Sequence, residues 1–244
     1  MILLLDAGNT RIKWGVRQAG TWVVRGVCGT HEVALLGDDL AAFPLRRALV
    51  CCVANDATRA VLYSLLAPRV EQLEWLTAAA DAHGVRNTYQ PPESLGADRY
   101  AALVAAARRG LGACVVASVG TALTVDALTA DGQFLGGAIA PGPELMQAAL
   151  LHGTAGVRDF AGTLAAFPVD TGAAVASGIA LAQVGVVAGM RERLARHTGQ
   201  TVTVLLSGGA RALLANLLPP PVVEADDLVL EGLAWIAKDR EWED

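Results

Sequence analysis

The chain has 244 residues, of which 53% are hydrophobic and 18% charged, so it can bury a large core and lacks the composition of a disordered protein. Its formal net charge is −5, and it has no cluster of Lys and Arg interleaved with aromatic residues, which disfavours nucleic acid as a partner. Its four cysteines lack C-x-x-C spacing, which is typical of buried thiols in a reducing compartment and predicts a cytoplasmic location.

The first predicted element is a buried strand over residues 2–5, which leads through Asp6-Ala7-Gly8-Asn9-Thr10 into a second strand at about 12–16. The N–H groups of such a turn can donate to phosphate oxygens, Lys13 adds a cation, and Asp6 can hold Mg²⁺ through water. A hairpin with an Asx turn fits the same residues, so they alone leave both interpretations open. The apolar run is interrupted by Asp6 and has no basic segment before it, which disfavours a signal peptide.

Further strands are predicted near 21–24, over 47–53 and over 72–76, and a helix over 56–66 has Asn55 or Asp56 as its N-cap. A loop at 87–96 precedes a helix from 97 to about 109. The start of that helix, Gly96-Ala97-Asp98-Arg99, admits two interpretations. Asp98 could serve only to stabilise the helix dipole. Alternatively, Asp98 could accept a hydroxyl proton while Arg99 binds a carboxylate or phosphate.

The second half opens with a hairpin of the same build as the first. Residues 114–126 predict a strand, the turn Gly120-Thr121 and a second strand, and Gly120 follows Gly8 by 112 residues (120 − 8), near half of the chain. This repeat predicts a duplicated α/β domain with a nucleotide in the cleft between the copies. Beyond it we expect strands at 133–139 and 202–206, the turn Ser207-Gly208-Gly209, and helices at 144–151, 172–198, up to about 217, and 227–238.

One segment raises the alternative of a membrane span. Residues 171–190 include no formal charge and are long enough to cross a bilayer. Their apolar members are mostly Ala and Val, diluted by four glycines, so we expect an interior or interface helix instead of a membrane partner. The signatures G-x-x-x-x-G-K-[ST], G-x-G-x-x-G, G-x-S-x-G and H-E-x-x-H are absent, which disfavours P-loop, acyl-transfer and zinc enzymes.

Six motifs follow one another over about residues 2–235: Asp6-x-Gly-Asn-Thr10, Gly96-x-Asp98-Arg99, Gly120-Thr121-Ala122-x-Thr124-x-Asp126, Gly136-Gly137-x-Ile139-x-Pro141-Gly142, Thr171 with Ser177-Gly178-Ile179, and Ser207-Gly208-Gly209. In this order they resemble the motifs of the type III pantothenate kinases, within the acetate and sugar kinase/Hsp70/actin superfamily. This resemblance implies an α/β fold of two actin-like, ribonuclease H-like domains, at 1–112 and 113–244, each with a mixed five-stranded sheet. It also implies ATP-dependent phosphorylation of pantothenate by a homodimer.

The resemblance further implies a role for each matched residue. Asp98 is the expected general base, and the expected pantothenate-binding residues are Tyr89, Gly96, Ala97, Asp98, Arg99 and Thr171. The expected ATP-binding residues are Asp6, Ala7, Gly8, Asn9, Thr10, Arg11, Ile12, Lys13, Thr121, Gly208 and Gly209. Asp6 is expected to lie near the Mg²⁺ that accompanies ATP.

One position departs from the family pattern. The family usually has Asp-x-Gly-Thr in the second turn, and that acid is associated with a monovalent cation such as K⁺ or NH₄⁺, whereas this chain has Ser118. A hydroxyl offers one oxygen ligand without the charge, so we expect weak or absent K⁺ dependence. The departure also supports an alternative function, a catalytically weak or inactive regulatory protein of the same fold. Sugar and acetate-type kinases are the alternative enzymes, and Gly96-x-Asp98-Arg99 favours the pantothenate group over them.

Overall fold

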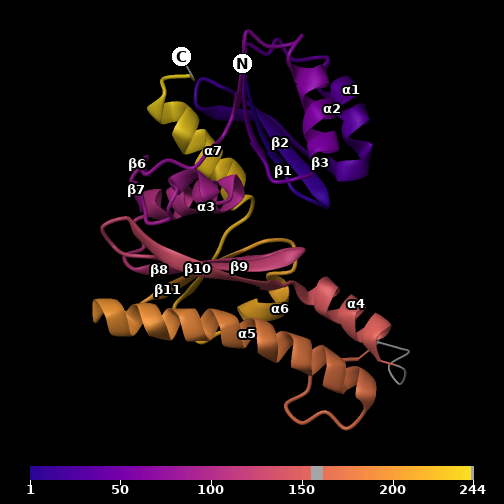
Figure 1. Ribbon diagram of the computed structural model, residues 1–244, viewed down its shortest axis with the longest axis vertical. Coiled ribbons are helices and arrows are strands. Elements are labelled where there is room, and N and C mark those ends of the chain that lie inside the picture. Colours follow the sequence, from indigo (N-terminus) through magenta and orange to yellow (C-terminus); the bar gives the residue numbers. More distant parts are fainter. Residues whose placement is uncertain (155–161, 243–244) are drawn as a thin grey trace. The chain divides into compact units, whose positions relative to one another are not determined.

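The computed structural model describes residues 1–154 and 162–242, which form two compact units (Figure 1). Unit 1 consists of Met1–Gly110 together with the segment that starts at Asp227, and unit 2 consists of Leu111–Asp226. The first change of unit lies close to the expected domain boundary between residues 112 and 113. The expected second domain, 113–244, differs from unit 2 at its end, because the last helix packs in unit 1.

Unit 1 is built on a mixed sheet of five strands. The order is β3-β2-β1-β4-β5, in which β1 pairs antiparallel with β2 and parallel with β4. All four residues of the apolar run at 2–5 are buried on both faces of the sheet, which fixes the point where β1 ends. The strands are β1 (Ile2–Ala7), β2 (Arg11–Gln18), β3 (Thr21–Gly29), β4 (Arg47–Cys52) and β5 (Gln72–Trp75).

The helices of unit 1 include two that the sequence predicted closely. The helix α2 (Asp56–Leu66) has the predicted bounds, and Asn55 caps it by accepting from the Thr58 N–H at 2.9 Å. The helix α3 (Ala97–Arg108) begins where it was expected. The other elements are η1 (Thr30–Leu35), α1 (Leu36–Leu40), the hairpin β6 (Asp81–Ala82) and β7 (Val85–Asn87), η2 (Pro92–Ser94) and α7 (Leu228–Asp239).

Unit 2 repeats the strand topology of unit 1. Five of its strands follow the order β10-β9-β8-β11-β12, in which β8 pairs antiparallel with β9 and parallel with β11. The same order and directions relate β3-β2-β1-β4-β5, so the duplication predicted from the two glycine turns is confirmed. The strands are β8 (Cys114–Val119), β9 (Ala122–Leu128), β10 (Gln133–Pro141), β11 (Thr203–Ser207) and β12 (Val222–Glu224).

Within its described residues, unit 2 also has the helices α4 (Pro143–Gly153), α5 (Thr171–Thr198) and the short α6 (Ala212–Ala215). By length and composition α5 could cross a membrane, but it packs along β8, β9 and β11 on one face of the sheet, as the predicted interior helix would (Figure 1). Asp170 caps its first turn, and Gly199, in the left-handed conformation, ends it.

The helix α7 packs closely against α3 within unit 1. A Cβ at Gly232 would lie 1.9 Å from the carbonyl oxygen of Ala101, so only glycine allows the two helices to approach this closely. Leu230, Leu233 and Ile236 of α7 are buried, and the helix also contacts β1 and β4. The pairing of α7 with α3 explains why the end of the chain joins unit 1, and it supports the first turn of α3, where Asp98 lies.

Candidate active site

The turn between β1 and β2 is closed by its own hydrogen bonds and anchored to η1. The Gly8 N–H donates to the carbonyl of Arg11 at 3.0 Å. Thr30 donates through its hydroxyl to the carbonyl of Gly8 at 2.9 Å and through its N–H to that of Thr10 at 3.1 Å. Asn9 and Thr10 remain exposed. The turn is thus a hairpin connection with outward-facing polar groups, so the two interpretations left open from the sequence are compatible.

Asp6, at the end of β1, is partly buried and lies among other ionisable groups. The pKa of its carboxyl is raised from 3.8 to about 7, chiefly by burial and then by the charge of Asp98, with a smaller contribution from Asp227, while Lys13 and a hydrogen bond from Cys51 oppose the change. A carboxylate in this setting favours the arrival of positive charge. The first turn of α3 and the end of β1 therefore contribute two interacting acids to one region of unit 1.

Cys51 is a residue whose part in this region the sequence did not predict. We expected its thiol to be a small buried hydrophobic group, and it is fully buried. However, it lies opposite Asp6 in the parallel pairing of β1 and β4, and its thiol is hydrogen-bonded to the Asp6 carboxyl. Burial, followed by the nearby acids, raises the pKa of Cys51 well above its usual value, so it remains a protonated donor. Only the register of the two strands reveals this contact.

Lys13 lies opposite Asp6 in the antiparallel pairing of β1 and β2. Its ammonium nitrogen is 2.8 Å from Oδ1 of Asp227, the N-cap residue of α7, and both side chains are about one-third exposed, at 33% and 32%. No local pattern predicts this ion pair, since its members are separated by 214 positions. Asp227 is thus a second residue of this region that sequence reasoning missed.

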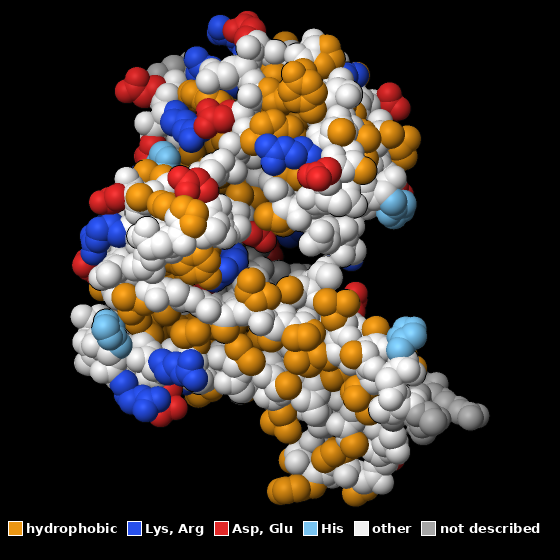
Figure 2. All heavy atoms as spheres, in the orientation of Figure 1, with side chains coloured by type: hydrophobic (Ala, Val, Ile, Leu, Met, Phe, Trp, Pro, Cys, Tyr) orange, Lys and Arg blue, Asp and Glu red, His pale blue; other side chains and the backbone are white. Residues whose placement is uncertain are grey.

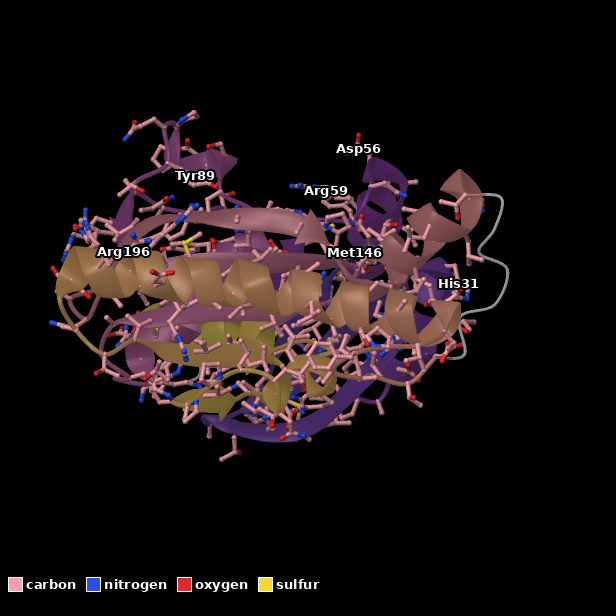
Figure 3. The ribbon with its side chains drawn as sticks, turned by 90° about the horizontal axis from the view of Figure 1, so that it is seen from below. His31, Asp56, Arg59, Tyr89, Met146 and Arg196 are labelled. Atoms are coloured by element: carbon pink, nitrogen blue, oxygen red, sulfur yellow. The ribbon has the colours of Figure 1, made fainter. Side chains whose placement is uncertain are left out.

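The segment from Gly96 to Arg99 brings two expected substrate residues together. Asp98 accepts a hydrogen bond from the N–H of Arg99 at 2.8 Å, and a Cβ at Gly96 would lie 2.8 Å from the same carboxyl oxygen, so glycine leaves space for this orientation. Arg99 is buried, with 7% of its surface exposed, and donates to the hydroxyl of Tyr89 at 3.1 Å. Tyr89, on the segment before α3, is labelled in Figure 3.

The second turn, between β8 and β9, is packed against two other glycine segments in unit 2. The Gly142 N–H donates to the carbonyl of Thr121 at 2.9 Å, and a Cβ at Gly142 would lie 2.0 Å from the carbonyl oxygen of Gly120. Gly208 has a φ of +95°, and its Cβ would lie 2.3 Å from the carbonyl oxygen of Val119. Glycine is required at both positions, and the three segments therefore meet at the end of β8.

Ser118 occupies the position in β8 that Asp6 occupies in β1. Its partner across the parallel pairing with β11 is Ser207, and its partner across the antiparallel pairing with β9 is Thr124. The three residues form a row of hydroxyl side chains without a formal charge. This row offers neutral oxygens to a cation at the place where the family pattern has an acid.

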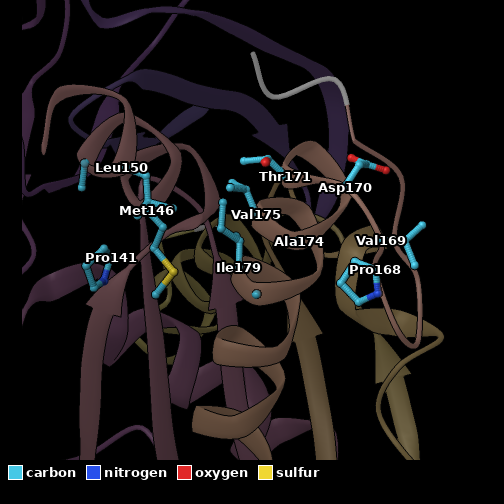
Figure 4. A pocket seen from close by; sticks show the side chains of 12 residues that line it. Pro141, Met146, Leu150, Pro168, Val169, Asp170, Thr171, Ala174, Val175 and Ile179 are labelled. Atoms are coloured by element: carbon cyan, nitrogen blue, oxygen red, sulfur yellow. The ribbon is translucent and has the colours of Figure 1, made fainter. Parts of the chain in front are cut away.

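Thr171 is the first residue of α5 and lines a pocket of unit 2 with a volume of about 880 Å³ (Figure 4). Asp170 caps the helix beside it by accepting from the Ala173 N–H at 2.8 Å. The remaining lining is mostly apolar and comes from α4, α5 and the segment before α5, including Met146, Leu150 and Ile179. Thr171 belongs to unit 2 and Tyr89 to unit 1, so the two expected substrate residues lie in different units.

The described residues include no group of three or more His, Cys, Asp or Glu side chains that could enclose a metal ion. Mg²⁺ does not need such a cage, because it retains waters and is usually held by one or two carboxylates together with substrate phosphates. Asp6 fits this requirement: it is partly buried, the pKa of its carboxyl is raised to about 7, and Asp98 lies close enough to contribute to that change. The donor set therefore fits Mg²⁺ brought with a nucleotide.

Comparison with known proteins relates this arrangement to a family. The sequence profile described as type III pantothenate kinase matches residues 2–193. A protein from Aromatoleum aromaticum named type III pantothenate kinase is 43% identical over 240 residues, which covers 98% of each chain.

Two solved structures are similar in fold at low sequence identity. A Campylobacter jejuni protein described as a Baf family transcriptional activator has a TM-score of 0.63 at 19% identity and matches over 98% of both chains. A Sinorhizobium meliloti protein described as a 2-dehydro-3-deoxygalactonokinase has a TM-score of 0.58 at 17% identity and matches over 99% of both chains. These similarities confirm the expected duplicated, actin-like α/β fold. Because the family profile matches most of the sequence and a 43% identical relative matches nearly its full length, the chain belongs to the type III pantothenate kinase family.

Proposed function

We propose that Asp98 is the general base with which this chain performs the reaction of its family, the ATP-dependent phosphorylation of pantothenate that begins coenzyme A biosynthesis. The observation that supports this assignment is the grouping of Asp98 with Asp6 and Lys13 in unit 1, where their charges interact. Asp98 combines a carboxylate with a fixed orientation, since it is held by the N–H of Arg99. A carboxylate so placed can orient a hydroxyl group and receive its proton.

The transferred phosphoryl group passes between two oxygens. The primary hydroxyl of pantothenate forms a new bond to the γ-phosphorus of ATP, the bond from that phosphorus to the bridging oxygen of ADP breaks, and the hydroxyl proton moves to Asp98. Such transfers have loose transition states, so positioning and charge neutralisation contribute more than activation of the nucleophile. Proton transfer to Asp98 is accordingly late, and an ordinary carboxylate is adequate for it.

The first turn supplies the groups that neutralise phosphate charge. The turn residues Asn9 and Thr10, whose side chains are exposed, and the Lys13 ammonium donate to phosphate oxygens. Asp6 would hold Mg²⁺ through water, and the metal would supply positive charge that offsets the negative phosphates. In the second half, Thr121, Gly208 and Gly209 bind the nucleotide from the adenosine side through the backbone groups of their turns.

Pantothenate is bound by the segment from Gly96 to Arg99 with Tyr89 and Thr171. Arg99 offers a cation for the substrate carboxylate, and its hydrogen bond to the Tyr89 hydroxyl fixes the guanidinium orientation. Gly96 and Ala97 have little or no side chain, so the substrate can reach the start of α3. The hydroxyl of Thr171 adds a donor at the start of α5.

The homodimer and the cytoplasmic location implied by the sequence also remain part of this proposal. The exposed apolar side chains of α4 and the segment before α5 support an interface there, and Figure 2 shows hydrophobic side chains gathered over this part of unit 2. These residues are Leu145, Leu150, Leu151, Leu164, Phe167 and Val169. A monomeric mass by light scattering at micromolar concentration would argue against the dimer.

The direct experiment follows phosphopantothenate formation by the purified protein with MgATP and pantothenate. The variant Asp98→Asn should lower kcat by orders of magnitude while the Kd for MgATP stays close to the native value. The matched control is Asp56→Asn, which removes an exposed acid from the first turn of α2 and should leave kcat unchanged. A near-native kcat for Asp98→Asn would remove Asp98 as the base, and an inactive native protein would favour the regulatory alternative.

A further inference from the structure

Asp227 departs from the usual behaviour of an aspartate at the start of a helix. An N-cap aspartate normally accepts a hydrogen bond from the N–H groups of its own first turn. Asp227 makes no such bond to α7, and only its backbone carbonyl contributes, by accepting from the Glu231 N–H at 3.0 Å. Its carboxylate is directed instead to the ammonium group of Lys13 at 2.8 Å. Capping therefore does not explain this side chain.

The backbone of Asp227 supports the same conclusion. Its φ of +41° and ψ of +44° lie in the left-handed region, which is unfavourable for residues other than glycine, although Asp and Asn tolerate it best. Such conformations persist where the surrounding structure enforces them, and they are frequent at functional sites. Here the conformation joins the end of unit 2 to α7 at the point where the carboxylate reaches β2.

The Lys13 ammonium group needs an acidic partner such as Asp227 if it is to donate to a phosphate oxygen from a defined position. Its side chain has four flexible bonds, and Asp6 lies directly across the β1–β2 pairing as a competing acid. If Asp227 were absent, the ammonium group would be free to pair with Asp6, which we assign to Mg²⁺. The contact with Asp227 keeps Lys13 ordered and leaves the Asp6 carboxylate accessible.

We propose that Asp227 is a positioning residue that holds the Lys13 ammonium group in place for phosphoryl transfer. The inference rests on the proposed function and adds a residue to the same site. Asp227 also carries a negative charge close to the phosphate turn, so its removal should not weaken the binding of the polyanion MgATP. A loss of kcat without a loss of nucleotide affinity is therefore the specific signature of this role.

The experiment measures kcat and the calorimetric Kd for MgATP in Asp227→Asn. Asparagine keeps the size of the side chain and its tolerance of the left-handed conformation, so the variant removes mainly the charge. We expect kcat to fall about tenfold, which corresponds to ~1.4 kcal/mol. The Kd for MgATP should be unchanged or lower. If this variant does not fold, Asp227→Gly relieves the backbone strain and should show the same two effects.

The matched control is Glu231→Gln on the same helix. It removes the ion pair of Glu231 with Arg109, and it should leave kcat and Kd unchanged. The side chains of Arg109 and Glu231 are 28% and 29% exposed, similar to those of Lys13 and Asp227. A second control repeats Asp227→Asn in a Lys13→Met background, where it should have no further effect on kcat. The inference is overturned if kcat stays within about twofold of native, if Kd rises in proportion to the fall in kcat, or if the loss persists without Lys13. An inactive native protein would instead contradict the proposed function itself.

Discussion

The contact between α3 and α7 allows a sharp test, because it connects packing with the position of the proposed base. Gly232 on α7 approaches the backbone of Ala101, three residues after Asp98. In Gly232→Ala the new Cβ would lie 1.9 Å from the carbonyl oxygen of Ala101 and 2.5 Å from its carbonyl carbon. Because these atoms are backbone, no side-chain rotation relieves the clash. The two helices must separate by about 1.5 Å to restore an ordinary contact of 3.4 Å.

The magnitude follows from opposing effects. Overpacking a close contact costs about 3 kcal/mol when the obstacle is backbone, since the separated helices lose contacts along their length. Alanine in place of glycine returns ~1 kcal/mol through helix propensity. The net loss is about 2 kcal/mol, or ~4–8 °C in Tm for a chain of this size. Because α3 includes Asp98, a displacement on the order of 1 Å should also lower kcat ~100-fold.

Thermal unfolding and the phosphorylation assay measure the two effects. The control is Gly185→Ala on α5, where the new Cβ meets no atom within 4 Å and the helix should gain ~1 kcal/mol. The same chemical change is thus expected to lower Tm at one site and raise it at the other. An equal or higher Tm for Gly232→Ala would refute the packing argument. A lower Tm with unchanged kcat would refute the link to Asp98.

Two further predictions concern charge at the two turns. The pKa of Asp6 is raised from 3.8 to about 7, chiefly by burial, so the folded protein favours the protonated carboxyl. The contribution of Asp6 to the unfolding free energy of the metal-free protein is therefore complete at acidic pH and is lost as the pH rises through about 7. Asp6→Asn should therefore reduce the fall in unfolding free energy between about pH 4.5 and 8.5 by roughly 3 kcal/mol in urea titrations with a chelator, and parallel curves for the two proteins would contradict this. At the second turn, the uncharged row at Ser118 predicts little activation by K⁺. Strong activation at physiological K⁺, relative to a salt of a non-coordinating cation, would disprove that prediction.

The sequence predicted the elements whose causes are local. Three predictions depended on neighbouring residues only: the strand from the apolar run before Asp6, the helix from the cap at Asn55, and the duplication from the repeated turn at Gly120. All three are confirmed. Elements with weak local signals were missed. The strand β12 has only three residues, and the hairpin of β6 and β7 is similarly short, so neither has enough alternation to be recognised.

The missed residues of the site share a different cause. Cys51 reaches Asp6 only because β1 and β4 pair in parallel with that register, and Asp227 reaches Lys13 across 214 positions. A cysteine in an apolar run is ordinarily a buried thiol, and an aspartate before a helix is ordinarily its N-cap. No spacing in the sequence distinguishes Cys51 and Asp227 from other residues of these kinds. The placement of α7 in unit 1 also depends on a long-range fit between Gly232 and Ala101.

The two glycine turns show how a duplicated fold can divide the chemistry of one reaction. Asp6 has Lys13 across from it on β2 and Cys51 on β4, whereas Ser118 has Thr124 on β9 and Ser207 on β11 in the corresponding pairings. The first turn therefore combines an acid, a cation and a buried donor, and the second offers only hydroxyl and amide groups. Mg²⁺ and the phosphate charge are best matched by the first set. We propose that the second set contacts neutral parts of a nucleotide, because its hydroxyl and amide groups have no formal charge, whereas glycine at positions 142 and 208 is explained by packing against the backbone of Gly120 and Val119.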